Sequence, residues 1–142
     1  METMTTLLAL CRRLIGRTTI RRERGSSSIQ MVILMPALFS IMFLGMQGAL
    51  YHHARTVAIA AAQEGARTAG AQHGTVGDGV GAASSFVADA GGNDVLPGAR
   101  VAGSRSATTA TVRVSGTSLS VIPGWSPTVS QSASVPVERI TQ

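Results

Sequence analysis

The feature that most constrains this chain is a run of 29 residues, Ser26 to Ala54, without a charged side chain. Within it, residues 29–50 are almost entirely apolar, with Gln30, Ser40 and Gln47 as polar interruptions. About 20 predominantly apolar helical residues cross the hydrocarbon core of a bilayer, and a helix without a polar face is not typical of a soluble protein. We therefore predict a transmembrane helix at residues 26–53.

The charge of the chain is concentrated ahead of this run. Residues 1–25 hold six arginines and two glutamates, a net charge of +4, out of +5 for all 142 residues. Because arginine-rich flanks stay in the cytoplasm, residues 1–25 are predicted to be a cytoplasmic leader, and residues 54–142 are predicted to lie outside the cytoplasm. The sequence thus predicts a single-pass protein of the cell membrane.

Two other interpretations of the N-terminal part stay open. A cleavable secretory signal also joins a basic region to an apolar core. That core usually has ~7–15 residues and ends at a small-residue cleavage site, and no clean site of this kind closes the run near residues 50–55. A basic cytoplasmic nucleic-acid binder is disfavoured, because no helix-turn-helix or aromatic context accompanies the arginines. We therefore expect the membrane, and no nucleic acid, as a partner.

Residues 54–70 are rich in alanine and are predicted to extend the helix beyond the bilayer. Small residues recur on one face of this extension, at positions 58, 61, 62, 65 and 69. Two interpretations of this face are open: it packs against neighbouring helices in an assembly, or it lies on the chain's own small domain. Glu64 and Arg67 have the i,i+3 spacing of an ion pair.

The remaining residues predict a small exported domain, so the fold class expected for the chain is α+β. Gly74 to Gly81 is interpreted as a flexible turn, and a short amphipathic helix at about residues 78–90 is expected to end at Gly91 and Gly92. Alternation of valine with polar residues predicts a small antiparallel β-sheet within residues 99–137. The expected strands are 99–104, 108–115, 119–122 and 129–137. Trp125 is predicted to cap a thin core.

Residue types that carry out catalysis or bind metals are sparse. Cys11 is the only cysteine, so the chain has no intramolecular disulfide and no cysteine metal cluster. All three histidines fall between residues 52 and 73, no serine stands in a nucleophile motif, and Asp78, Asp89 and Asp94 lack the spacing of a metal loop. We therefore expect no catalytic residue, no cofactor and no metal site, and a protein that is not an enzyme.

The junction between the leader and the apolar run carries a recognisable motif. Residues 21–36 read RRERGSSSIQMVILMP, a basic stretch followed by Gly25, small residues and the apolar helix. This order resembles a class III prepilin leader and is most similar to the TadE-like minor pilins, or pseudopilins, of tight-adherence (Tad/Flp, type IVb) pilus systems. Further positions fit the same family: Ser26, Pro36, Glu64, Gly65, Ala66 and Arg67.

The resemblance implies a processing site and a set of partners. A prepilin peptidase is expected to cleave between Gly25 and Ser26, after the basic residues Arg21, Arg22 and Arg24, and to leave the membrane helix in the mature protein. The implied partners are this peptidase, other pilin or pseudopilin subunits and the pilus assembly machinery. Helix assembly is expected to involve Gln30, Pro36, Gly45 and Ala49.

Gln30 departs from the family pattern, in which a glutamate stands at this position. A carboxylate there can pair with the N-terminal ammonium of a neighbouring subunit and lower the cost of holding charge in lipid, whereas an amide can only hydrogen-bond. Two hypotheses follow: this subunit enters a filament less readily, or it occupies a tip or priming position where the pairing is not needed.

Together these features predict a structural pseudopilin that takes part in assembly of a Tad/type IVb pilus. The alternative is a single-pass anchored or secreted surface-binding protein that is unrelated to pili. The two hypotheses differ in the mature N-terminus. Processing at Ser26 is expected for the pseudopilin, whereas an intact Met1 indicates an anchor, and cleavage near residues 50–60 indicates secretion.

Overall fold

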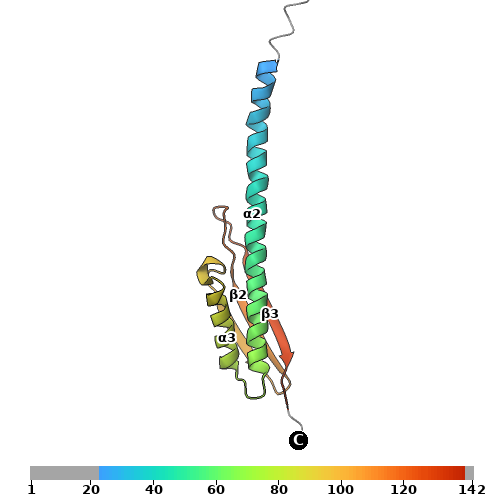
Figure 1. Ribbon diagram of the computed structural model, residues 1–142, viewed down its shortest axis with the longest axis vertical. Helices are drawn as coiled ribbons and strands as arrows, with labels where there is room; N and C mark the ends of the chain where they lie inside the picture. The colour runs from blue at the N-terminus through green and yellow to red at the C-terminus, as the bar shows by residue number, and fades with distance from the viewer. Residues whose placement is uncertain (1–22, 140–142) are drawn as a thin grey trace, which may run out of the picture. The chain divides into compact units, whose positions relative to one another are not determined.

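A computed structural model describes residues 23–139 of the chain, with side chains from Ile29 onward. In chain order, the elements are helix α2 (Glu23–Gly70), helix α3 (Val76–Asp89), the short 3-10 helix η1 (Gly92–Asp94) and strands β1 (Arg100–Arg105), β2 (Thr109–Thr117) and β3 (Thr128–Pro136) (Figure 1). A long apolar helix, a second helix and a small antiparallel sheet confirm the predicted α+β class. The chain divides into two compact units between Met42 and Phe43, within α2.

The first unit is, over its described residues, the N-terminal part of α2. Pro36 lies inside this helix without ending it, although proline lacks the backbone N–H of a normal helical residue. One turn later the hydroxyl of Ser40 donates to the carbonyl of Pro36 at 2.7 Å. Every side chain from Ile29 to Met42 is exposed, so none of the described residues covers this part of the helix. Its side chains are apolar apart from Gln30 and Ser40.

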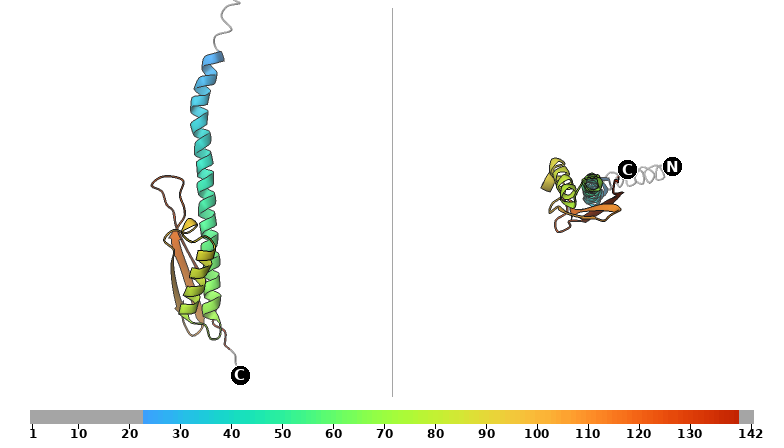
Figure 2. Two further views of the ribbon diagram at one scale, coloured as in Figure 1. Left: turned by 60° about the vertical axis from the view of Figure 1, so that its left-hand side comes forward. Right: turned by 90° about the horizontal axis from the view of Figure 1, so that it is seen from below.

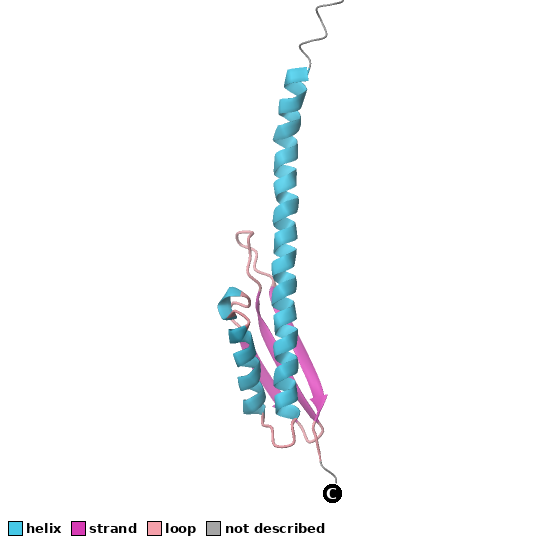
Figure 3. Cartoon of the chain, in the orientation of Figure 1, coloured by secondary structure: helices cyan, strands magenta, loops and turns pink. Residues whose placement is uncertain are grey.

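The second unit contains the rest of α2 and all the other elements. Its three strands form an antiparallel meander in the order β1-β2-β3, coloured magenta in Figure 3. In the register, Val112 of β2 faces Gly103 of β1 and Ala133 of β3. Helix α3 and the end of α2 cover the same face of the sheet, as the view from below in Figure 2 shows. The opposite face is rich in serine and threonine, as expected for an antiparallel sheet with one solvated side.

The core between helices and sheet is thin and is built from small residues. Six alanines of α2 are buried, at positions 54, 58, 61, 62, 66 and 69, each exposed by 1% or less. They meet Ala83 and Val87 of α3 and the inward valines Val112, Val114 and Val129 of the sheet. The small-residue face of the helix extension therefore lies on the chain's own domain, which is the second of the two interpretations left open by the sequence.

Gly65 shows why this face needs small residues. A Cβ atom placed on Gly65 would lie 2.6 Å from the carbonyl oxygen of Gly79 and 2.8 Å from the Cβ of Ala83. It would also lie 3.0 Å from Cγ1 of Val112 in the sheet. Any larger residue at position 65 must push α3 and β2 away from α2, so glycine sets the approach of all three elements here.

Helix α3 begins earlier than the sequence interpretation placed it. The expected short helix at about residues 78–90 is present as α3, but the expectation of a flexible turn at Gly74 to Gly81 is wrong from Val76 onward, where the chain is already helical. The N–H of Asp78 donates to the hydroxyl of Thr75 at 3.2 Å, and the N–H of Thr75 donates to Asp78 Oδ2 at 3.0 Å. This reciprocal capping box stabilises the helix start despite three glycines in the stretch that follows.

The expected strand at residues 119–122 is also wrong, because these residues belong to the connection between β2 and β3. We call residues 118–127 the β2–β3 loop. It is closed at its base by the N–H of Ser118, which donates to the carbonyl of Pro127 at 2.9 Å. Gly124 in the loop has a φ of 78°, a conformation that favours glycine. The Leu119 carbonyl and the Val121 N–H, which a strand would use for pairing, instead form hydrogen bonds with the side chain of Gln47, as described below.

Candidate functional site: the apolar helix and the β2–β3 loop

The apolar part of α2, residues 29–46, is the most unusual surface of the described chain. All of its side chains are exposed, among them Val32 at 73% and Ile41 at 69%. A helix that is apolar all round is found in a membrane or deep inside a large protein, and nothing in the described residues covers this one. By length and composition α2 can cross a membrane.

Gln47 ends this exposed stretch, and only 2% of its surface is accessible. Its amide makes three hydrogen bonds to the β2–β3 loop. Nε2 donates to the carbonyl of Leu119 at 3.2 Å, while Oε1 accepts from the N–H of Val121 at 3.0 Å and from the hydroxyl of Ser120 at 3.2 Å. The side chain thereby takes the pairing groups that the expected strand would have used.

In the sequence, Gln47 stands out only as a polar interruption of the apolar run. A glutamine late in an apolar helix, followed far along the chain by an uncharged loop, gives no signal of a contact between positions 47 and 121. The partners are 74 residues apart, so the contact depends on the tertiary fold.

Trp125 does not cap the core, contrary to expectation. It is 50% exposed and lies outside the buried cluster, because the loop carries it past the end of the sheet. Together with Leu44, Tyr51 and Pro127 it lines a cavity of about 340 Å³ between the loop and α2, next to Gln47. The loop and this turn of the helix thus form one surface with aromatic and aliphatic side chains.

The element Glu64–Arg67 combines two roles. Gly65 and Ala66 are buried against α3 and the sheet, as described above. Glu64 and Arg67 lie on the outer side, where Arg67 Nη1 is 3.8 Å from Glu64 Oε2. An exposed pair of this kind stabilises the protein by less than about 1 kcal/mol. Within this element, the buried Gly65 and Ala66 therefore contribute more to the stability of the fold than the ion pair does.

The residues expected to mediate helix assembly and processing are placed as follows. Gln30, Pro36, Gly45 and Ala49 are all exposed on α2, and a Cβ added to Gly45 would meet nothing within 4 Å. Gly25, Ser26 and Arg24 lie in the first turns of α2, but their side chains are outside the described set. Arg21 and Arg22 lie outside the described residues. Whether these positions act in assembly or cleavage stays a prediction.

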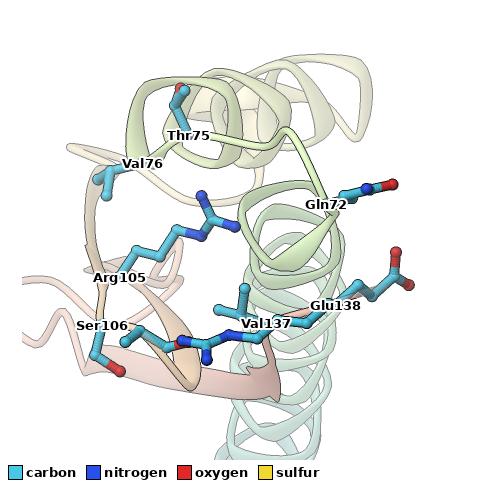
Figure 4. Close-up of a pocket in the computed structure, with 9 residues that line it drawn as sticks. Gln72, Thr75, Val76, Arg105, Ser106, Val137 and Glu138 are labelled. Atoms are coloured by element: carbon cyan, nitrogen blue, oxygen red, sulfur yellow. The ribbon is translucent and has the colours of Figure 1, made fainter. Parts of the chain in front are cut away.

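A second cavity, of about 570 Å³, lies where α2 ends and is shown in Figure 4. Arg105 points from the end of β1 toward the chain that links α2 to α3. Its guanidinium donates to the carbonyl of Ala71 at 3.1 Å and also to that of Gly74. The N–H of Glu138 donates to the carbonyl of Gly70 at 2.9 Å. These contacts satisfy carbonyls at the helix end, so Arg105 has a structural role here.

The titratable side chains of the described residues are scattered over the folded unit and α2. Among residues 23–139, His, Cys, Asp and Glu form no group of three or more that can hold a metal ion. His52 and His53 are exposed on α2, and His73 is exposed in the turn after it. Asp78 is committed to the capping box, and its hydrogen bonds from the Thr75 hydroxyl and backbone N–H lower the pKa of the carboxyl.

Fold and surface together define a small α+β unit joined to a helix that is long and apolar enough to cross a membrane. Residues 25–67 match the family model described as TadE-like protein, which confirms the resemblance seen in the sequence over this part of the chain. The match covers the apolar part of α2 and ends at Arg67 of the family element. No curated protein and no solved structure matches the chain.

Proposed function

We propose that this chain is a membrane-anchored structural subunit, a pseudopilin, that takes part in assembly of a Tad/type IVb pilus. The observation that carries the proposal is the extent of the family match. It begins at Gly25, the residue after which the leader is expected to be cleaved, and continues through the whole apolar part of α2 to Arg67. A family resemblance confined to the folded unit would not have pointed to a processed membrane helix.

The proposed topology places the leader in the cytoplasm and the folded unit outside it. Its support is the net charge of +4 in residues 1–25, ahead of a helix whose next charged residue is Arg55. Arginines near one end of a span are retained on the cytoplasmic side.

A structural role, without enzymatic activity, is supported by what the polar groups of the unit do. Gln47 holds the β2–β3 loop, Arg105 holds the end of α2, and Asp78 caps α3. Each of these side chains is engaged in maintaining the fold. The proposed partners are a prepilin peptidase, other pilin or pseudopilin subunits and the assembly machinery.

Intact-mass measurement of the membrane-extracted protein, produced together with a prepilin peptidase, tests the proposal. We expect a mature N-terminus at Ser26. The variant Gly25→Val should keep residues 1–25, whereas Gly16→Val, which alters another glycine of the leader, should be processed like the wild type. An uncleaved wild-type chain would instead indicate a simple anchor, and a new N-terminus near residues 50–60 would indicate a secreted protein.

Gln30 allows a second test, which concerns incorporation rather than processing. Gln30 lies exposed on the apolar part of α2, where a carboxylate can pair with the new N-terminal ammonium of a neighbouring subunit. If the missing acid limits incorporation, Gln30→Glu should raise the amount of subunit recovered in sheared pili. Unchanged recovery would reject a limiting role for this carboxylate.

A further inference from the structure

The β2–β3 loop belongs to a long uncharged stretch of the folded unit. Residues 114–137 contain no Asp, Glu, Lys or Arg, and the loop lies in the middle of this stretch. Surface loops of soluble domains are usually polar, because their backbone must be solvated. Here the loop exposes Leu119 at 38% and Trp125 at 50%.

The exposed large apolar side chains of the unit gather around this loop. Among described residues after Met46, the large apolar or aromatic side chains that are exposed are Tyr51, Phe86, Leu119 and Trp125. Tyr51 and Trp125 line the same 340 Å³ cavity, and Leu119 belongs to the same loop. Three of the four thus belong to the β2–β3 loop or to the turn of α2 that the loop contacts.

The hydrogen bonds of Gln47 fix the position of the loop along α2. About 20 helical residues cross the hydrocarbon core, so a span that begins at Ile29 ends near Gly48. Gln47 therefore falls in the last turn of such a crossing, inside the predicted transmembrane helix of residues 26–53, and its three hydrogen bonds hold Leu119 to Val121 at that level. A buried amide also needs these partners, because an unsatisfied polar group in lipid is costly.

We propose that the β2–β3 loop enters the outer interface of the bilayer that α2 crosses and forms a second membrane contact, with Leu119 and Trp125 touching lipid. Tryptophan and tyrosine favour the boundary between headgroups and hydrocarbon, because their rings are apolar and their N–H or O–H groups remain hydrated. Trp125 and Tyr51 provide these rings, and the absence of charge in the loop removes the main cost of entry. This inference rests on the proposed membrane anchorage.

Trp125 is the only tryptophan of the chain, so its fluorescence reports on the loop directly. The full chain is reconstituted in phosphatidylcholine vesicles that contain lipids brominated near the headgroup or near the chain end, and iodide serves as the aqueous quencher. We expect Trp125 to be quenched several-fold more strongly by the shallow brominated lipid than by the deep one. Its quenching by iodide should be weak.

Two single-tryptophan variants separate this inference from the proposed anchorage. In a Trp125→Phe background, Phe39→Trp should respond to the deep brominated lipid, whereas Ala107→Trp, in the turn between β1 and β2, should respond to iodide alone. If position 39 responds to bromolipid but Trp125 responds only to iodide, the loop inference is overturned and the anchorage stands. If position 39 does not respond to bromolipid either, the anchorage itself fails.

A third outcome identifies a different occupant. If Trp125 is shielded from both bromolipid and iodide, protein covers the loop, and the lipid proposal is overturned in favour of a second copy of the chain. Quenching by the shallow lipid that is unchanged when the protein is diluted among the vesicles supports the lipid contact, because a contact between copies would weaken on dilution.

Discussion

The two ends of α2 have different surfaces, although they belong to one continuous helix. In the apolar part, residues 29–46, large side chains are exposed on every side. In residues 54–70 the inward face is alanine and glycine, buried against α3 and the sheet, and the outer face carries charges such as Glu64 and Arg67. Large apolar side chains suit lipid, whereas small ones let protein elements approach closely. The surface of residues 29–46 therefore suits contact with lipid, and the inward face of residues 54–70 suits contact with protein.

Deleting the same side chain in the two regions should have very different effects on the folded unit. Leu96 is fully buried in the core, whereas Leu38 is 62% exposed in the apolar part of α2. We expect Leu96→Ala to destabilise the folded unit by about 3 kcal/mol, through lost burial and a remaining cavity. Leu38→Ala should leave that stability unchanged. Hydrogen exchange of β2 and β3 amides in detergent micelles measures both, and equal effects would break the comparison.

Substituting alanine for glycine at two positions of α2 tests the same difference between its two parts. At Gly65 the added Cβ would meet a backbone oxygen at 2.6 Å, whereas at Gly45 it meets nothing within 4 Å. We expect Gly65→Ala to cost about 2 kcal/mol, in the range of core overpacking. Gly45→Ala should be neutral for the folded unit, as measured by the same exchange experiment. Tolerance of alanine at position 65 would show that α3 and β2 move apart freely.

Gln47 lies between the two parts of α2, and its substitution should destabilise only the β2–β3 loop. Gln47→Leu removes the partners of the Val121 N–H and the Leu119 carbonyl, and an unsatisfied buried group costs roughly 1–2 kcal/mol. The Val121 amide should therefore exchange faster, while amides in the middle of β2 change little. Gln63→Leu, at an exposed position of α2, is the matched control. Unchanged exchange at Val121 would contradict the described contact.

The smallest expected effect concerns the cap of α3 and depends on pH. The Thr75 hydroxyl and the backbone N–H lower the pKa of Asp78 from its ordinary 3.8, so the ionised carboxylate is favoured in the folded state. Its contribution to stability is present above the ordinary pKa and is lost as the pH falls through the lowered one. Thr75→Val should raise the pKa of Asp78 toward 3.8 and weaken the helix start by about 1 kcal/mol.

A carboxyl chemical-shift titration of wild type and Thr75→Val measures this pKa, and exchange of the first amides of α3 follows the cap. In the wild type these amides should become less protected at acidic pH. An identical titration of Asp78 in both proteins would show that the hydroxyl does not stabilise the carboxylate.

Much of this architecture follows from local sequence patterns. The uncharged run predicted one long helix, and valine alternation predicted strands close to β1, β2 and β3, because both signals depend on neighbouring residues. The start of α3 was missed although Thr75 and Asp78 have capping-box spacing, since the surrounding glycines suggested a turn. That signal was present in the sequence and can be recognised from the spacing alone.

The contact of Gln47 with the loop could not be predicted in the same way. Residues 119–122 alternate like a strand, and only the folded arrangement shows that a helix side chain takes their hydrogen-bonding groups. For the same reason Trp125 was expected in the core rather than beside α2. The sequence also could not show what the small-residue face of residues 54–70 packs against, because alanines at helical spacing can pack against a neighbouring subunit or against a sheet of the same chain.

The most direct test of the central claim compares the solvent around the two parts of α2. In a Cys11→Ser background, single cysteines at Leu38 and Gln63 carry spin labels, and the protein is reconstituted in lipid bilayers. The label at position 38 should be accessible to oxygen and shielded from a water-soluble nickel chelate, and the label at position 63 should show the reverse. Equal access of the nickel chelate to both labels would contradict a membrane-spanning apolar part of α2.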